Sequence, residues 1–292
     1  MRLLNFGSLN IDYVYRMASI VTPGETLASR SLDVFAGGKG ANQSVALARA
    51  GAEVHHAGKV GPDGRWLRDT LERNGVDIEH TIIDESARTG HAVIQVDDAG
   101  ENAIVLFPGT NHQMDPEHIR GTLDRFGADD LLLLQNEINR IDELIMEAKR
   151  RDLTVCLNPA PWSPQAASLP LDRVDVMIVN ETEARGLAGV DDVEALLAQP
   201  SQFGLGHTHL IVTRGRRGVS YRRGDHRIDI DACPVEPVDT TAAGDTFIGY
   251  CLAAWYRGDS IDASLRRATT AAAICVGRAG AIDSIPESWE VA

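Results

Sequence analysis

The segment LLLLQNEINRIDELIMEAKRRDLTVCLN, residues 131–158, decides the fold class of this chain. It begins with an apolar run at 131–135, continues through the amphipathic stretch IDELIMEAKRR, and ends in a second apolar run, LTVCLN. Continuous apolar strands separated by a helix are typical of a parallel sheet whose two faces are covered by helices. The segment therefore predicts a strand–helix–strand unit of an α/β protein.

The same rhythm extends toward both ends of the chain. Short apolar runs predict further strands of the sheet at 3–7, 54–61, 174–180 and 209–213. Helix-favouring runs predict helices after the glycines at 37–40, over 63–75, from Glu181, and at 242–257 and 260–276. The expected architecture is a central, mostly parallel sheet flanked by helices.

Two stretches interrupt this rhythm. Residues 90–107 alternate in polarity around the polar turn DDAGEN, and a second strand-like stretch surrounds the Pro23-Gly24 turn. With no internal repeat and no low-complexity linker, the chain is expected to form a single α/β domain over 1–292. A small β excursion would be built from about 12–36 and 88–108.

Composition and charge limit the kinds of partner. The 292 residues include 28 Lys and Arg against 42 Asp and Glu, and the net charge of −14 repels nucleic-acid phosphates and anionic membranes. The four cysteines form no CxxC pair, which favours the reducing cytoplasm over a disulfide framework or a zinc site. Neither a signal peptide nor an apolar run near the ~18 residues that span a bilayer is found. Small molecules are the expected partners.

The most informative motif is VDTTAAGDTF, residues 238–247, in which small residues lead into an apolar helix. The N–H groups of Ala242, Ala243 and Gly244 face no bulky side chain. Because a helix N-terminus carries positive potential, a phosphoryl group fits there. Asp245 places a carboxylate beside this anion hole, where it could accept the proton of an attacking alcohol. The competing interpretation is that Asp245 caps the helix.

Polar side chains elsewhere suit the hydroxyl groups of a polyol. The stretch AGGKGANQ (36–43) combines glycines, which allow close approach of a ligand, with the donors Lys39 and Asn42. Asn10 and Asp12 alternate with apolar residues, so they share one face at the end of the first predicted strand. These residues predict a polar ligand site.

Two further motifs, LNPAPW (157–162) and VNETEA (179–184), directly follow predicted strands. Ligands bind at the carboxyl ends of the strands in open parallel sheets. Asn180 and Glu183 are three residues apart and therefore share one helical face. Both motifs are expected at the same edge of the sheet as the ligand site.

Several common signatures are absent from the sequence. No GxGxxG follows a strand, which argues against a dinucleotide enzyme, and no GxxxxGK[ST] phosphate loop occurs. The HRD and DFG elements of protein kinases and the GxSxG elbow of hydrolases are also missing. His207 and His209 have no acidic or cysteine partner nearby in the sequence. We therefore interpret them as part of a turn and the start of a strand, and not as metal ligands.

Four motifs occur together: GGKGANQ (37–43), NETEA (180–184), TRGRRG (213–218) and DTTAAGDTF (239–247). In them the chain resembles the ribokinase-like family of carbohydrate and nucleoside kinases, over essentially its whole length. The resemblance implies a Rossmann-like three-layer fold with a β-sheet lid over the sugar site. It also implies transfer of the γ-phosphoryl group of ATP to a hydroxyl group of a free sugar.

The resemblance further implies roles for individual residues. Asp245 is expected to be the catalytic base, with the N–H groups of Ala242, Ala243 and Gly244 as the anion hole. The sugar is expected at Asn10, Asp12, Gly38, Lys39, Asn42, Glu137 and Asp245. The nucleotide is expected at Asn180, Thr213, Gly215, Gly218, Gly244 and Thr269. Of the arginines in TRGRRG, each is better interpreted as solvated surface than as a phosphate ligand.

Two metal ions are also implied by the resemblance. Glu183 matches a glutamate that organises Mg²⁺ through water. A monovalent-cation site for K⁺, beside the anion hole, is implied at Asp239, Thr241, Cys275, Arg278, Gly280 and Ser284, mostly through backbone oxygens. The expected cofactors are thus ATP, Mg²⁺ and K⁺.

Ribose is the expected acceptor, giving ribose 5-phosphate. The matched positions show neither the extra cations expected for a phosphorylated sugar nor the stacking aromatic expected for a nucleoside. Another sugar or sugar acid, such as fructose or 2-keto-3-deoxygluconate, stays open, since Lys39 could meet a carboxylate. The alternative from a different class is a non-catalytic sugar-binding protein of the same fold, against which the intact Asp245 argues. The lid strands could also pair across a homodimer.

Overall fold

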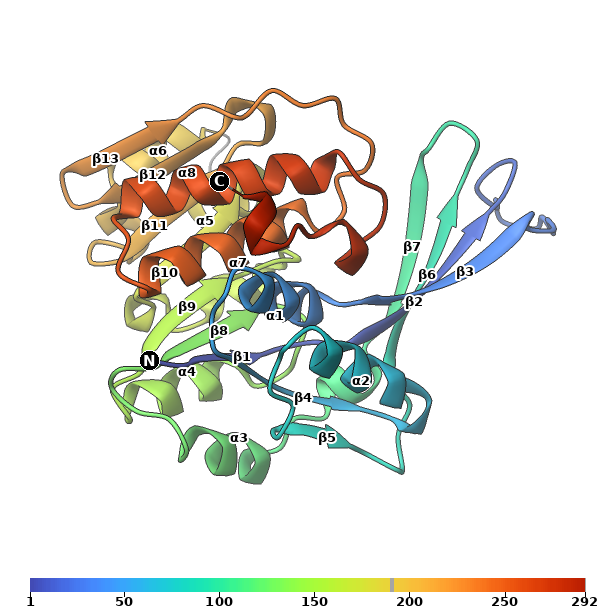
Figure 1. Cartoon of the computed structure of the whole chain (residues 1–292), viewed down its shortest axis with the longest axis horizontal. Helices are drawn as coiled ribbons and strands as arrows, with labels where there is room; N and C mark the ends of the chain where they lie inside the picture. Colours follow the sequence, from blue (N-terminus) through green and yellow to red (C-terminus); the bar gives the residue numbers. More distant parts are fainter. Residues whose placement is uncertain (190–191, 292) are drawn as a thin grey trace.

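The computed structural model describes residues 1–189 and 192–291, and within them nine strands form one sheet in the order β13-β12-β11-β10-β9-β8-β1-β4-β5 (Figure 1). These strands are β1 (Leu3–Phe6), β4 (Val54–Val60), β5 (Thr81–Ile83), β8 (Leu131–Gln135), β9 (Thr154–Asn158), β10 (Val176–Asn180), β11 (His209–Thr213), β12 (Val219–Arg223) and β13 (His226–Ile230). All neighbours from β5 to β11 run parallel, whereas β12 and β13 add an antiparallel hairpin. The predicted mostly parallel sheet is confirmed.

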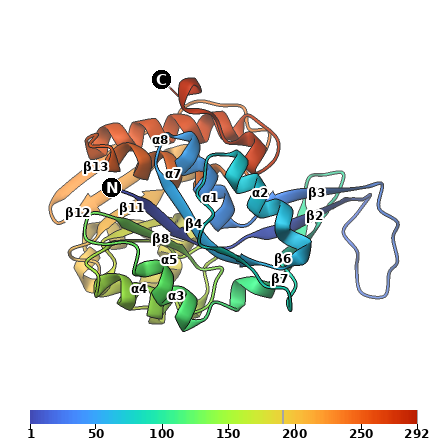
Figure 2. The ribbon, with the colours of Figure 1, turned by 60° about the horizontal axis from the view of Figure 1, so that its bottom comes forward.

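Helices cover both faces of this sheet (Figure 2). One layer contains α1 (Lys39–Arg49), α2 (Arg65–Arg73), α7 (Ala243–Tyr256) and α8 (Ile261–Val276), and the other contains α3 (Pro116–Leu123), α4 (Ile141–Lys149), α5 (Glu181–Ala188) and α6 (Val193–Ala198). Strand β8 shows why its run is continuously apolar. Leu131 and Leu133 belong to the core under the first layer, and Leu132 and Leu134 to the core under the second.

A separate four-stranded sheet projects from the body of the molecule (Figures 1 and 2). Its order is β3 (Ser31–Gly37), β2 (Asn10–Arg16), β6 (Gly90–Val96) and β7 (Asn102–Phe107). Strands β2 and β6 pair in parallel, and the outer strands are antiparallel to them. The two β excursions of the sequence thus join in one sheet.

Asn10 and Asp12 lie on β2 of the small sheet, and not, as predicted, at the end of the first strand. Strand β1 ends at Phe6 because the chain is crowded at the next residue. A Cβ atom at Gly7 would lie 2.6 Å from Cα of Gly40 and 2.5 Å from Oε1 of Gln135. The start of α1 therefore lies directly against Gly7, and the chain leaves the main sheet at this residue.

Some elements were not predicted, namely β5, β12, β13, α3 and α6. The hairpin of β12 and β13, VSYRRGDHRIDI, is rich in charged residues because it forms the edge of the sheet and exposes part of its surface. Helix α3 does carry a recognisable start, since Asp115 accepts a hydrogen bond from N–H of His118 and Pro116 follows it. No described helix is both long and apolar enough to cross a membrane.

Helices α1 and α7 cross in close contact, and this crossing positions the site. A Cβ atom at Gly249 of α7 would lie 2.4 Å from Cβ of Ala46 on α1. Only glycine allows the two backbones to approach this closely. The crossing brings the N-terminal turns of both helices, with Asn42 and Asp245, to the same place.

Candidate active site

Asp245 lies in the first turn of α7, where its side chain is buried. Its carboxylate accepts two hydrogen bonds from α1, at Oδ2 from Asn42 Nδ2 (3.0 Å) and at Oδ1 from Gln43 Nε2 (2.8 Å). The N-cap of α7 is Ala242, and no described side chain makes a capping hydrogen bond at this end. The interpretation of Asp245 as a helix cap is therefore wrong. Both of its oxygens are held by side chains from a distant part of the sequence.

The N-terminus of α7 is open to a ligand. Ala242 adopts a left-handed φ of 59°, a conformation that costs a non-glycine residue about 1–3 kcal/mol. Of the N–H groups expected to form an anion hole, that of Ala243 donates to the carbonyl of Thr240 at 3.3 Å. Those of Ala242 and Gly244 have no backbone partner within the described chain. A Cβ atom at Gly244 would meet nothing within 4 Å, so space lies beside it.

A cavity of about 570 Å³ opens at this helix end. Of the predicted nucleotide residues, those lining it are Thr213, Gly215, Gly218, Gly244 and Thr269. Most of the remaining wall is apolar and was not predicted: Ala232, Cys233, Pro234, Val235, Pro237, Phe247, Ala272, Ala273 and Val276. Arg216, Thr240 and Ala243 complete the lining. Part of this wall is formed by the apolar stretch ACPVEPV, which directly precedes the DTTAAGDTF motif and is the feature of the sequence from which it could have been predicted. The cavity joins an apolar chamber to a helix N-terminus.

The arginines of TRGRRG separate into two kinds. Arg214 Nη1 lies 2.8 Å from Oε1 of Glu194, and Arg217 forms an ion pair with Glu181. Both side chains are therefore held by carboxylates of neighbouring helices. Arg216, in contrast, lines the cavity together with Gly215 and Gly218.

Asn180 and Glu183 form a reciprocal capping box at the start of α5. Glu183 accepts from the backbone N–H of Asn180 at Oε2 and from its Nδ2 at Oε1, both at 2.8 Å. Burial raises the pKa of Glu183, on which the charges of Lys39 and Asp245 also act. Asn180 is not among the described residues that line the cavity. The pair is thus part of the charged group around Asp245, with both carboxylate oxygens already hydrogen-bonded.

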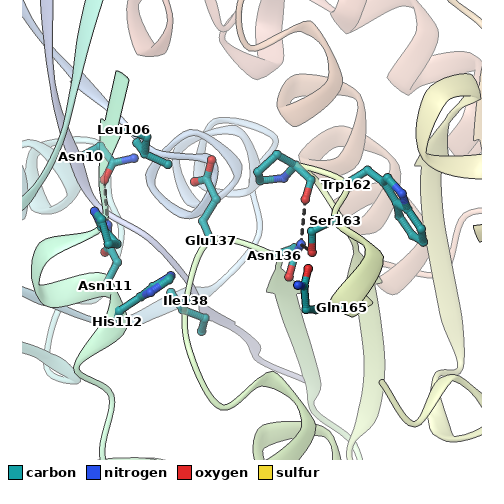
Figure 3. A pocket seen from close by; sticks show the side chains of 12 residues that line it. Asn10, Leu106, Asn111, His112, Asn136, Glu137, Ile138, Trp162, Ser163 and Gln165 are labelled. Atoms are coloured by element: carbon teal, nitrogen blue, oxygen red, sulfur yellow. Dashed lines mark hydrogen bonds between the residues drawn. The ribbon is translucent and has the colours of Figure 1, made fainter. Parts of the chain in front are cut away.

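A second cavity, of about 420 Å³, lies beside the carboxyl ends of β8 and β9 and next to the small sheet (Figure 3). Asn10 and Glu137 line it, as do Pro161 and Trp162 of the LNPAPW motif. The other lining residues were not predicted: Leu106, Pro108, Asn111, His112, Asn136, Ile138, Ser163 and Gln165. The cavity is rich in amide side chains.

Asn111 orients Asn10 at this cavity. Its Nδ2 donates to Oδ1 of Asn10 at 2.7 Å, the bond dashed at the left of Figure 3, and its Oδ1 accepts from N–H of Leu9 at 3.0 Å. Gly90 leaves the room for this pair, since a Cβ atom there would lie 2.2 Å from Nδ2 of Asn111. The amide of Asn10 is therefore fixed before any ligand binds.

Glu137 joins this cavity to the start of α1. Its Oε2 accepts from the backbone N–H of Lys39 at 2.9 Å and from the hydroxyl of Ser8 at 2.5 Å. Gly38, the N-cap of α1, has a φ of 92°, and a Cβ atom there would lie 3.0 Å from N of Asn10. The glycines of GGKG thus let α1 begin against the backbone that carries Asn10.

Lys39 lies among carboxylates. The charge of Asp245, followed by those of Glu137, Glu183 and Asp12, raises the pKa of Lys39 in spite of its burial. Burial, and then the charge of Glu137, raises the pKa of Asp12 to about 7. The lysine therefore stays charged at neutral pH, while Asp12 is close to half-protonated there.

The residues expected to hold a monovalent cation come from segments far apart in the sequence. Asp239 accepts from N–H and Oγ1 of Thr241 and, at 3.0 Å, from N–H of Gly280. Although burial acts in the opposite direction, these bonds hold the pKa of Asp239 below its usual value. Cys275 Sγ lies 3.6 Å from the carbonyl of Thr241 and 3.1 Å from Oγ of Ser284. The side chain of Arg278 points elsewhere, to an ion pair with Glu290.

A comparison with known proteins covers nearly the whole chain. A model of the pfkB family of carbohydrate kinases matches residues 2–288. The chain is 37% identical to the ribokinase of Haemophilus influenzae, over 97% of this chain and 95% of the relative. It is 36% identical to the ribokinase of Bacillus subtilis, over 98% and 96% of the two chains.

Solved structures agree with this match. The ribokinase of Cryptococcus neoformans in complex with ADP has a TM-score of 0.85 at 34% identity, covering 99% of this chain and 98% of that one. The ribokinase of Arabidopsis thaliana complexed with ribose and ATP has a TM-score of 0.86 at 28% identity, covering 99% and 96%. Sequence and fold together show that the chain belongs to the pfkB family of carbohydrate kinases.

Proposed function

We propose that this kinase transfers the γ-phosphoryl group of ATP to the primary hydroxyl group of ribose, forming ribose 5-phosphate. The observation that carries the proposal is that Asp245 is connected to the residues of both cavities. Gly244 beside it lines the larger cavity. Asn42, which donates to Asp245, lies in the same first turn of α1 as Lys39, whose backbone N–H donates to Glu137 of the smaller cavity. The similarity to ribokinases, one of them solved with ribose and ATP, supports both substrates.

We assign each group a step in the reaction. Asp245 would accept the proton of the ribose hydroxyl while its oxygen attacks the phosphorus atom. The N–H groups of Ala242 and Gly244 would stabilise the negative charge that develops on the transferred group. The phosphates of ATP would lie near Thr213, Gly215 and Gly218, where Arg216 offers an added cation, and the base would lie against the apolar walls near Thr269.

The polar side chains favour a neutral sugar as the acceptor. Sugar hydroxyls would meet Asn10, Asp12, Gly38, Lys39, Asn42 and Glu137. No lysine or arginine occurs among the described residues that line the smaller cavity. Among the residues predicted to bind the sugar, Lys39 is the one cation, and it lies among several carboxylates. These carboxylates would repel the anionic group of a phosphorylated sugar or of a sugar acid such as 2-keto-3-deoxygluconate. Fructose, which is neutral, is the second candidate.

Release of ADP, measured across a panel of free sugars, tests this proposal. Ribose should give the highest kcat/KM, with fructose and 2-keto-3-deoxygluconate well below it, and the product should carry its phosphate on the primary hydroxyl group. A preference for a different sugar would overturn the choice of substrate. Binding of sugar without any turnover would instead point to a non-catalytic protein.

The affinity for ribose should fall as the pH is lowered from 8 to 6. Because the pKa of Asp12 is raised to about 7, this carboxyl is mostly ionised at pH 8 and mostly protonated at pH 6, where it has fewer lone pairs to accept hydrogen bonds from sugar hydroxyls. Calorimetric titration with ribose in the absence of nucleotide avoids the protonation of ATP itself. The variant Asp12→Asn should bind ribose weakly and with little dependence on pH. A wild-type affinity that is constant over this range would contradict the prediction.

We also propose that Mg²⁺ and K⁺ serve this enzyme. Glu183, whose oxygens are occupied by Asn180, fits contact with a hydrated Mg²⁺ through water, and such an ion would neutralise charge on the nucleotide phosphates. The oxygen-rich group of Asp239, Thr241 and Ser284, close to the start of α7, fits K⁺. A bound cation there would hold the N–H groups of the anion hole in place before reaction.

Potassium should raise kcat several-fold at constant ionic strength, and Asp239→Ala should remove this response. General screening by salt is the competing explanation, since a protein with a net charge of −14 repels ATP. Rates in potassium, sodium and tetramethylammonium salts at equal ionic strength separate the two effects. Asp283→Ala is the matched control, because this exposed carboxylate lies in the same segment as Gly280. Equal rates in all three salts would remove the specific site.

We further propose that residues 1–292 act as one kinase domain whose small sheet closes over the acceptor as a lid. Large apolar side chains on its edge strands are exposed: Leu32, Val34, Phe35, Ile104, Val105, Leu106 and Phe107. A second copy of the chain could cover them, so a homodimer through the lid is proposed, and sedimentation equilibrium would test it.

The four cysteines are free thiols, which suits the reducing cytoplasm that we propose as the location.

A further inference from the structure

A line of buried amide side chains leads away from Asp245 into the centre of the protein. Gln43 Nε2 donates to Oδ1 of Asp245 at 2.8 Å and to Oδ1 of Asn158 at 3.2 Å. Gln43 Oε1 accepts from Nε2 of Gln135 at 2.7 Å, and the same Nε2 donates to Oδ1 of Asn5 at 2.9 Å. We refer to Gln43, Gln135, Asn5 and Asn158 as the amide network.

The amide network is buried as completely as the apolar core. Gln43 and Asn5 have no exposed surface, and Gln135 and Asn158 are 1% and 5% exposed. None of the four is among the described residues that line either cavity. Burying an amide is unfavourable unless its groups are hydrogen-bonded, and apolar residues of similar size fill a core without this cost. Ligand contact does not account for the network, whose one charged end is Asp245.

The network spans elements that cannot shift independently. Gln43 comes from α1, whereas Asn5, Gln135 and Asn158 come from the neighbouring strands β1, β8 and β9. Asn5 also donates to the carbonyl of Gly40, and Asn158 to that of Ile178 on β10. The Nε2 group that faces Asp245 is therefore anchored to the rigid centre of the sheet, not to a loop.

The two donors to Asp245 differ in what else they can do. Asn42 has a buried Oδ1 without a partner among the described residues, so its amide remains available to an acceptor substrate. Gln43 has its oxygen bound to Gln135 and its nitrogen bound to Asp245 and Asn158. A carboxylate only accepts hydrogen bonds, so this orientation of the Gln43 amide is the one that satisfies Asp245. Asn42 therefore has an oxygen that is free for a further partner, whereas both the nitrogen and the oxygen of the Gln43 amide are already hydrogen-bonded.

We infer that Gln43 is a positioning residue, which fixes the plane of the Asp245 carboxylate so that its free lone pairs point at the acceptor hydroxyl. The inference rests on the proposed role of Asp245 as the base. Proton transfer depends on the distance and direction between base and hydroxyl, so a carboxylate free to rotate would accept the proton less often. Gln43 itself touches neither substrate.

Gln43→Met tests this inference, because methionine fills a similar volume but has no donor for Asp245. We expect kcat to fall about ten- to hundredfold, the effect of losing a hydrogen bond to a charged group. The KM values for ribose and for ATP should stay within about twofold of wild type. The matched control is Gln135→Met, which breaks the network one bond further away and leaves the Gln43–Asp245 contact in place. Its kcat should stay within a few-fold of wild type, although its thermal stability falls similarly.

A double-mutant cycle with Asp245→Asn separates positioning from general loss of structure. If Gln43 acts through the base, Gln43→Met should lower kcat no further once Asp245 is replaced. If it only supports the fold, its effect should be the same in both backgrounds, which would overturn the inference. If Gln43→Met fails to fold, Gln43→Asn can be used instead. Its side chain keeps an amide but is one methylene shorter, so the amide no longer reaches Oδ1 of Asp245, and the same loss of kcat is expected.

The outcomes also separate this inference from the proposed function. An inactive Asp245→Asn together with a fully active Gln43→Met would overturn only the positioning role. A fully active Asp245→Asn would overturn the proposed base, whatever Gln43→Met does.

Discussion

Asp245→Asn is expected to lower kcat by ~10²–10⁴-fold while ribose binding stays close to wild type. Asparagine keeps the shape of aspartate but cannot accept a proton from the hydroxyl group. The two donors that face Asp245 limit the structural damage. Asn42 has a free Oδ1, so its amide can turn to accept from the new NH₂ group, while Gln43 keeps its bond to the remaining oxygen. The measurement is kcat from ADP release, with ribose binding followed by calorimetry.

The matched control for this variant is Asp262→Asn. Asp262 also lies in the first turn of a helix, α8, but its side chain is about half exposed and pairs with Arg266. The same chemical change there should leave kcat unaltered. Near wild-type kcat in Asp245→Asn would show that a different group accepts the proton. Loss of the circular dichroism signal in Asp245→Asn alone would instead show that Asp245 is needed for the fold.

Lys39→Ala is expected to raise the KM for ribose about ten- to hundredfold, and the KM for ATP much less. Asp245, Glu137 and Asp12 all act on the Lys39 ammonium. Removing it takes away a charged donor for sugar hydroxyls and leaves these carboxylates uncompensated, so they repel one another and bind a hydroxyl-rich ligand in less defined positions. Initial rates over a ribose series and an ATP series give both constants.

Two comparisons test this expectation. Lys149→Ala removes another of the three lysines, one that pairs with Asp175, and should change neither KM. Asn10→Ala should raise the KM for ribose in the same direction as Lys39→Ala, because Asn111 holds the Asn10 amide in place at the smaller cavity. An unchanged KM for ribose in both Lys39→Ala and Asn10→Ala would place the sugar elsewhere.

The strands and helices of the main sheet could be predicted where the sequence had a strong period. The continuous apolar run at 131–135 indicates a strand that is buried on both faces of the sheet. The structure confirms this, since alternate leucines of the run belong to the two cores on opposite faces of the sheet. The edge hairpin over 219–230 was missed, because its burial depends on a single neighbour, β11, which a local pattern does not reveal. The family was predicted correctly from four short motifs, and the match over residues 2–288 confirms it.

The sequence by itself determined which chemistry is available: small residues at a helix start, a carboxylate after them, and a glycine-rich loop with a lysine. Only the tertiary structure decided how these groups meet. Asp245 is held by Asn42 and Gln43, which are 203 and 202 residues away, and Asn10 by Asn111, 101 residues away. The reason is physical. A helix start or a strand period arises from neighbours in the sequence, whereas the partner of a buried polar group is set by which elements the packed core brings together.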